Sequence, residues 1–194
     1  MRVLIACEES QTVSKAFRAK GHEAYSCDIL PCSGGKPEWH IQGDVLEHLD
    51  DGWDMMIAHP PCTYLSNAGA CHLFPKGELN QERYKLGIEA KEFFYKLLNA
   101  PIQRICVENP VQSKVFGILK YNQIIQPYQF GHPMAKKTCL WLKNLPPLKP
   151  TNILTEYQST KVAGNWYNKG GKERQKNRSK TFQGIADAMA DQWT

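Results

Sequence analysis

The chain has 194 residues, of which 42% are hydrophobic and 22% charged, with a formal net charge of +5. This composition is typical of one folded globular domain and excludes a disordered or fibrous chain. The longest apolar runs are too short for a membrane span, the start reads as a strand rather than a secretion leader, and seven cysteines without a regular framework favour a reducing, cytoplasmic setting.

Hydrophobic periodicity predicts strands and helices in alternation. In chain order we expect strand 2–6, helix 11–20, strand 23–27, loop 29–39, strand 40–42, strand 53–58, a mobile segment 67–77, helix 78–99, strand 104–108, short helix 114–119, strands 124–128 and 138–142, and helix 184–193. Such alternation favours an α/β fold with a Rossmann-like, doubly wound, mostly parallel sheet. We expect residues 1–194 to form a single domain.

Positive charge is concentrated near the C-terminus. Residues 161–180 contain seven Lys or Arg and one Glu, a net +6, so the rest of the chain carries about −1 (5 − 6). This run lies in 143–180, which we interpret as a short basic insertion that contacts nucleic acid. The alternative is a solvated loop, since charge runs are usually that.

Two polar segments directly follow predicted strands. His59-Pro60-Pro61-Cys62 follows strand 53–58, and Glu108-Asn109 ends strand 104–108, 46 residues after Cys62. Open α/β sheets place their chemistry at the carboxyl ends of strands. A thiolate that adds to C6 of a pyrimidine makes C5 nucleophilic, and an acid at N3 stabilises the adduct. The pattern therefore predicts Cys62 as nucleophile and Glu108 as acid; His59 reads as a plain turn residue.

These segments resemble the DNA cytosine-5 methyltransferases, and more closely small phage- and prophage-type proteins that share the wording Ala58 to Leu65. Pro60 to Ser66 is similar to the family's nucleophile motif, Pro-Pro-Cys-Gln-x-Phe-Ser, and Glu108-Asn109 to its Glu-Asn motif. Further similar segments are Gly43-Asp44-Val45, Asp28, Phe130-Gly131-His132-Pro133 with Lys136, and Gly184 to Ala190. The order of these segments agrees with the family over nearly the whole chain.

The resemblance implies methyl transfer from S-adenosyl-L-methionine to C5 of a cytosine flipped out of duplex DNA, in a bacterium or a phage-infected host. It implies cofactor contacts by Cys7, Glu8, Glu9, Ser10, Asp28, Asp44 and Pro60. Nucleic-acid contacts are expected from Ser66, Asn109, Lys136, Lys172, Arg174, Lys176 and Arg178. It implies no metal.

The sequence departs from this family at three places. Cys7 to Thr12 stand where the family has a Gly-rich loop, and Thr138 stands where it has the second Arg of an Arg-x-Arg pair. Only about 40 residues, 143–180, occupy the place of its target-recognition domain, and chains of that size rarely fold alone. This third departure is consistent with an unidentified partner that supplies the specificity for the target sequence.

Other functions compete with this interpretation. His59, Cys62, Cys71 and His72 could bind a metal, but they lack the close Cys-x2-Cys pair of zinc sites. Amino-methyltransferases place Asp or Asn before Pro-Pro and an aromatic residue after it, whereas this chain has His59 and Cys62. A non-catalytic nucleic-acid-binding or cofactor-sensing relic, and an enzyme acting on free pyrimidine nucleotide or RNA, stay open as alternatives.

Overall fold

The computed structural model describes residues 1–159 and 180–194, which contain a seven-stranded sheet of order β3-β2-β1-β4-β5-β8-β6. The strands are β1 (Arg2–Ala6), β2 (Glu23–Asp28), β3 (His40–Gln42), β4 (Met55–Ala58), β5 (Arg104–Pro110), β6 (Gln123–Ile125) and β8 (Thr138–Lys143). The pairings along β3-β2-β1-β4-β5 are parallel, and β8 is antiparallel to both β5 and β6. The prediction of a doubly wound, mostly parallel α/β sheet is confirmed.

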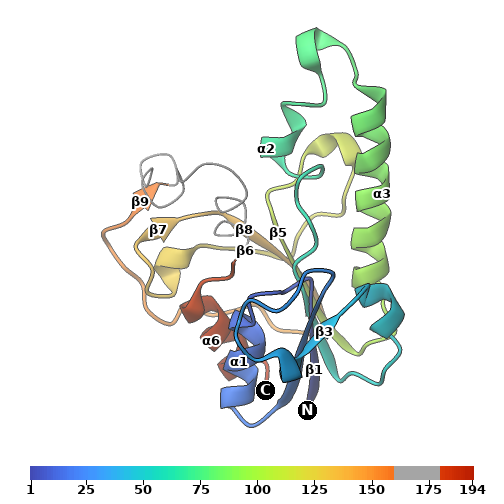
Figure 1. Cartoon of the computed structure of the whole chain (residues 1–194). Coiled ribbons are helices and arrows are strands. Elements are labelled where there is room, and N and C mark those ends of the chain that lie inside the picture. The colour runs from blue at the N-terminus through green and yellow to red at the C-terminus, as the bar shows by residue number, and fades with distance from the viewer. Residues whose placement is uncertain (160–179) are drawn as a thin grey trace.

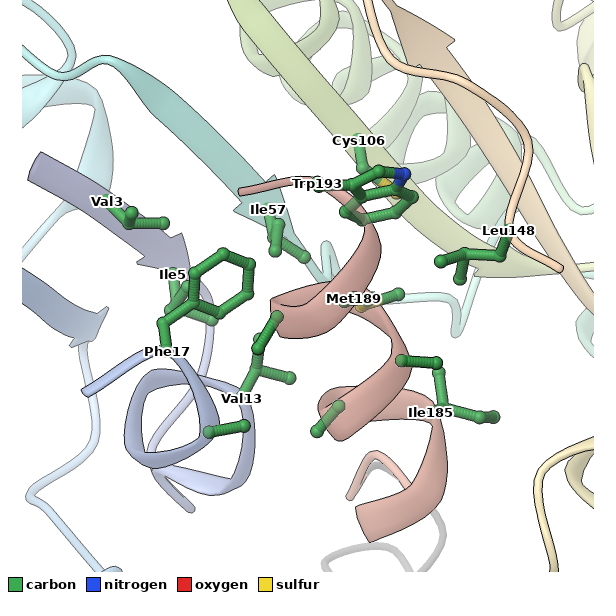
Figure 2. Close-up of a cluster of buried hydrophobic side chains, with 14 of the residues drawn as sticks. Val3, Ile5, Val13, Phe17, Ile57, Cys106, Leu148, Ile185, Met189 and Trp193 are labelled. Atoms are coloured by element: carbon green, nitrogen blue, oxygen red, sulfur yellow. The ribbon is translucent and has the colours of Figure 1, made fainter. Parts of the chain in front are cut away.

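Helices cover both faces of the sheet (Figure 1). Helices α1 (Thr12–Ala19) and α6 (Gln183–Gln192) pack together on one face, and α3 (Gln81–Leu98) lies on the other. Figure 2 shows Phe17 of α1 and Met189 of α6 over Ile5 and Ile57 of the central strands. Alternate residues such as Leu4 and Ala6 join the core on the α3 side, so these strands are apolar throughout, as expected for parallel strands covered on both faces.

The predicted helix 78–99 begins later in the structure, at Gln81. The Asn80 side chain accepts a hydrogen bond from the Arg83 amide at 2.9 Å and caps this end. On the sheet side of α3, the Phe94 ring meets Trp141 of β8 edge-on at 5.0 Å. This packing attaches the antiparallel strand β8 to the same core.

Other elements differ from the sequence prediction. The helix expected over 114–119 is a short 3-10 helix, η4 (Lys114–Phe116), because Gly117 takes a left-handed conformation (φ 57°) and ends it. The strand expected over 124–128 stops at Ile125, and the 3-10 helix η5 (Pro127–Gln129) follows. The segment 67–77 contains helix α2 (Asn67–Ala70) and 3-10 helix η3 (Pro75–Gly77).

The local sequence pattern did not predict the small second sheet, in which β7 (Met134–Ala135) pairs in parallel with β9 (Gln158–Ser159). It also missed the 3-10 helices η1 (Pro37–Trp39) and η2 (Val45–His48). Across the two described ranges, no helix has the length and apolar character needed to cross a membrane.

Candidate active site

Three loops meet at the carboxyl edge of the sheet. Ala6 of β1 lies opposite Ala58 of β4, and Ala58 lies opposite Val107 of β5. The His59 amide donates to the Ala6 carbonyl at 2.9 Å and extends the ladder by one residue. The residues after β1 and β4, and the last residues of β5, therefore stand at one level, where strand ends of α/β sheets carry their chemistry.

The loop that carries Cys62 is attached to the Glu-Asn segment. The Asn109 side-chain amide donates to the Pro60 carbonyl at 2.8 Å, and Asn109 is 1% exposed. Gln112 in turn donates to the Asn109 side-chain oxygen at 2.7 Å. Because the two prolines also restrict the backbone ahead of Cys62, the partly exposed thiol stands on a rigid turn.

The chain beyond Cys62 is held by helices. Ser66, 5% exposed, caps α2 by accepting a hydrogen bond from the Gly69 amide at 3.2 Å. Arg83 of α3 donates to the Thr63 and Gly69 carbonyls at 3.1 and 3.2 Å. Ser66 and Asn109, which we expected to contact nucleic acid, are thus both directed to internal contacts.

His59 and Glu108 form a buried pair. His59 Nδ1 lies 2.9 Å from Glu108 Oε2, and the two side chains are 8% and 16% exposed. Burial by itself raises the pKa of Glu108, but the hydrogen bond and charge of His59, together with the charge of Lys136, outweigh it and hold the pKa below its usual value. Burial lowers the pKa of His59, yet Glu108 and Glu8 raise it above the usual value.

A narrow depression opens beside Glu108. Its lining includes Lys136, Thr138 and Phe182, and Lys136 Nζ lies 5.9 Å from the centre of the Phe182 ring. Lys136, predicted to contact nucleic acid, is therefore placed next to the predicted acid. A wider hollow of about 510 Å³ lies at the end of α1 beside Trp39, but its lining contains no carboxylate or thiol.

The structure also brings two further motif segments together. The Gly184 amide, at the start of α6, donates to His132 Nε2 at 3.0 Å. A Cβ atom on Gly184 would lie 2.0 Å from the Phe130 carbonyl oxygen, so the close approach requires glycine. The Phe130 to Pro133 segment and the C-terminal helix therefore form one wall on the Glu108 side of the sheet.

The loop after β1 keeps a bend that glycine usually supplies. Cys7 and Gln11 both have φ of 59°, in the left-handed region that most residues avoid. The Glu8 carboxylate, 5% exposed, accepts hydrogen bonds from the Val13 and Ser14 amides at 2.7 and 3.3 Å. Burial raises the pKa of Glu8, while the charge of His59 and these amides oppose the rise.

A second loop packs on this one. The Glu9 carbonyl and carboxylate accept hydrogen bonds from Ser33, at 2.8 and 3.1 Å. The buried Gln11 side chain bonds the Lys36 backbone in both directions, at 2.7 and 3.0 Å. The Ser10 hydroxyl lies 3.3 Å from that of Thr12. Hydrogen bonds therefore hold the predicted cofactor loop in place, although it lacks the glycines expected at these positions.

The two carboxylates predicted to contact the cofactor, Asp28 and Asp44, stand at the ends of β2 and β3. Asp28 accepts from the Leu30 amide at 2.9 Å, and Asp44 accepts from the Leu46 amide at 3.0 Å and caps η2. Next to Asp28, Ile29 and Leu30 are 74% and 54% exposed. Carboxylates that accept hydroxyl hydrogen bonds, beside exposed apolar side chains, fit the sugar and base of a nucleoside.

Several predictions stay untested. Lys172, Arg174, Lys176 and Arg178 lie outside the described residues, as does most of the predicted insertion 143–180. Within residues 1–159 and 180–194, no group of three or more His, Cys, Asp or Glu side chains is arranged to hold a metal ion.

The contact between His59 and Glu108 is not predicted by the local sequence pattern. The one indication in the sequence is the position of His59: it follows the last residue of one predicted strand, and Glu108 is the last residue of another. Only the β4–β5 register, which puts Ala58 opposite Val107, makes the next two residues neighbours.

No family model and no curated protein matches the chain. Among solved structures it is similar to an E. coli protein described as a DNA modification methyltransferase encoded within a prophage, with 15% identity, 79% of this chain and 52% of that chain covered, and a TM-score of 0.49. It is also similar to the Entamoeba histolytica methyltransferase EhMeth, with 13% identity, 89% of this chain and 61% of that chain covered, and a TM-score of 0.48. For a mutant of Spodoptera frugiperda DNMT2 the identity is 14%, 81% of this chain and 54% of that chain are covered, and the TM-score is 0.39. The chain thus spans between 52% and 61% of the length of these three proteins.

Proposed function

We propose that this protein transfers a methyl group from S-adenosyl-L-methionine to C5 of cytosine in DNA. The observation that carries the proposal is the attachment of the Cys62 loop to the Glu108-Asn109 segment. Two contacts make it: His59 to Glu108 at 2.9 Å and Asn109 to the Pro60 carbonyl at 2.8 Å. A thiol and a carboxyl group held on one sheet edge suit covalent attack with acid assistance.

The chain's own residues supply the nucleophile and the acid of the cytosine chemistry. The Cys62 thiolate adds to C6 of the ring, and the electron pair of the C5–C6 bond becomes available at C5. Glu108 hydrogen-bonds N3, where negative charge would otherwise develop. After C5 has gained the methyl group, loss of the C5 proton to a base and expulsion of the thiolate restore the aromatic ring.

The methyl donor supplies an electrophilic methyl group on sulfur. Asp28 and Asp44 would hold its sugar and base, with the exposed Ile29 and Leu30 against the flat face of the adenine. The bend at Cys7 and Gln11 supports this placement, since the backbone there takes the conformation that a glycine-rich loop would take.

DNA is proposed as the acceptor because the net +6 over 161–180, with Trp166 and Tyr167 among the charges, suits stacking on nucleic acid and pairing its phosphates. C6 is shielded in a stacked duplex, so the cytosine must be flipped out. With so short an insertion, we infer that sequence recognition is supplied by a separate partner protein.

The decisive experiment incubates the protein with radiolabelled S-adenosyl-L-methionine and duplex DNA, single-stranded RNA or dCMP, and then separates the nucleosides. The proposal predicts label in 5-methylcytosine from DNA. Label from RNA or dCMP alone would support the free-nucleotide or RNA alternative. If calorimetry detects no binding of the cofactor or of S-adenosylhomocysteine at millimolar concentration, the protein is a non-catalytic relic.

A further inference from the structure

His59 lies where it can act on Glu108 rather than on the cytosine ring. Ala58 and Val107 are opposite each other and face the α3 side, so the next residues, His59 and Glu108, point to the face covered by α1 and α6. Their side chains meet through Nδ1 and Oε2 at 2.9 Å. The contact follows from strand register and does not depend on a flexible loop.

Besides Glu108, charged groups from two other places act on the imidazole. Glu8, from the loop after β1, acts on it as a second negative group, and its carboxylate is held by the N-terminus of α1. Lys136, which precedes β8, acts as a positive group on both His59 and Glu108. In the described part of the chain, His59 Nε2 is buried and accepts or donates no hydrogen bond.

This arrangement places the proton of the pair on His59 rather than on Glu108. Two carboxylates and one lysine around a buried imidazole favour the imidazolium form, and the pKa of His59 is accordingly raised. The same contact lowers the pKa of Glu108, so its side chain is a carboxylate at neutral pH. A carboxylate has no proton to give to N3, although the proposed reaction needs one there.

We propose that His59 is a positioning residue that supplies, through Glu108, the proton that N3 of the cytosine receives when Cys62 attacks. The inference rests on the proposed function. The Nδ1–H bond of His59 breaks, the Glu108 carboxyl group is protonated in passage, and an N–H bond forms at N3. The imidazole ends neutral, Glu108 ends as a carboxylate, and elimination of the thiolate returns the proton by the same path.

The test compares the wild-type protein with His59→Asn, whose amide can still donate to Glu108 but cannot titrate. Turnover is measured against pH at saturating DNA and cofactor. The wild type should lose activity as pH rises through the His59 pKa, above 6.5, because the imidazolium is lost there. In His59→Asn this limb should move to lower pH, with a loss on the order of 10²-fold at pH 8.

His48→Asn is the matched control, because His48 also meets a carboxylate, Asp51 at 2.9 Å, but in a pair whose side chains are 29% and 46% exposed. Its pH profile should equal that of the wild type. An unmoved alkaline limb in His59→Asn, with the wild type active, would overturn this inference and leave the proposed function standing.

A second measurement needs neither turnover nor a variant that folds poorly. NMR titration of ¹⁵N-histidine-labelled wild-type protein reports the charge of each imidazole directly. We expect His59 to be protonated at pH 6.5 and its pKa to fall in Glu108→Gln. A neutral His59 at pH 6.5 overturns the inference whether or not methyl transfer is found. Absence of transfer with a protonated His59 overturns the proposed function, and with it the delivery of that proton to N3.

Discussion

The two halves of the sheet's carboxyl edge differ in how they match the motifs of the sequence resemblance. On the β4–β5 side the motif residues are present, and side-chain hydrogen bonds from His59 and Asn109 tie the two segments together. On the β1–β2 side the expected glycines are absent. There the backbone keeps left-handed conformations at Cys7 and Gln11, supported by Gln11 contacts to the 32–36 loop.

The difference separates side-chain chemistry from backbone shape. A thiol or a carboxyl group has no substitute in covalent catalysis, so that half must be carried by residue identity. A bend has substitutes, because tertiary contacts can offset the roughly 1–2 kcal/mol that a left-handed L-residue costs. We therefore expect substitutions in the first half to act on rate and those in the second to act on stability and cofactor affinity.

The largest effect is expected from Cys62→Ser. Loss of the nucleophile should lower methyl transfer on the order of 10⁴-fold or more, while calorimetry still shows cofactor binding. Cys71→Ser, at an exposed cysteine directly after helix α2, is the control and should keep full activity. A 5-fluorocytosine duplex should trap the wild type covalently. Methylation by Cys62→Ser at the wild-type rate would remove the covalent mechanism.

Glu108→Gln should be the next most damaging change. Glutamine keeps the shape and can donate a hydrogen bond, but it passes no proton to N3, so the rate constant should fall about 10²-fold or more. Glu92→Gln, on the exposed side of α3, serves as control. The check is single-turnover transfer at saturating DNA and cofactor, and an unchanged rate constant would exclude Glu108 from the chemistry.

The basic segment should affect affinity without sequence preference. Replacing Lys172, Arg174, Lys176 and Arg178 with Ala should weaken binding to every DNA by a similar factor. The slope of log K against log salt should flatten by about 0.9 for each phosphate that the variant no longer neutralises. Replacing Lys85 and Lys96 of α3 is the control. Weaker binding to one DNA sequence alone would mean that these side chains read bases, and unchanged binding would mean a solvated loop.

Two glycines allow each half to be disturbed alone. A Cβ on Gly69 would lie 2.1 Å from the Thr63 carbonyl oxygen, beside Cys62, and one on Gly34 would lie 2.5 Å from Gln11 Cβ. Each alanine variant should cost about 1–3 kcal/mol in denaturant unfolding. Gly69→Ala should reduce turnover, and Gly34→Ala should reduce cofactor affinity. The opposite result for each variant would refute the proposed separation of the two halves.

Gly43→Ala is the stability control for that pair, since its nearest neighbour, His48 Nε2, would be 3.8 Å away. It should unfold at nearly the wild-type denaturant concentration.

The smallest effect is expected at Cys7. Cys7→Gly should change the stability by less than about 1 kcal/mol, because relief of the left-handed strain is offset by the lost packing of the thiol on the core and by the entropy that glycine adds to the unfolded chain. Cys7→Val should destabilise it, since a branched side chain tolerates this conformation poorly. Urea unfolding at constant m-value measures both. Equal stability of the glycine and valine variants would show that the bend carries no strain.

Local sequence determined the strands of the seven-stranded sheet, the two long helices and the identity of the catalytic candidates. The apolar runs at 2–6, 53–58 and 104–108 could be read directly, because strands buried on both faces have few polar residues. Cys62 and Glu108 could be read because Cys62 lies in the short segment that follows one such run and Glu108 ends another. The ends of the short helix η4 and of strand β6 could not be predicted, since Gly117 and Pro127 each change the backbone conformation over only one or two residues.

Only the tertiary structure decided which residues meet at the edge. His59 read as a turn residue because its sequence neighbours are prolines, and its partner lies 49 positions away. Asn109 read as a surface contact, yet the fold turns it inward to the Pro60 carbonyl. Both outcomes depend on strand register, and a shift of one residue would reverse the face of every side chain, which local sequence does not reveal.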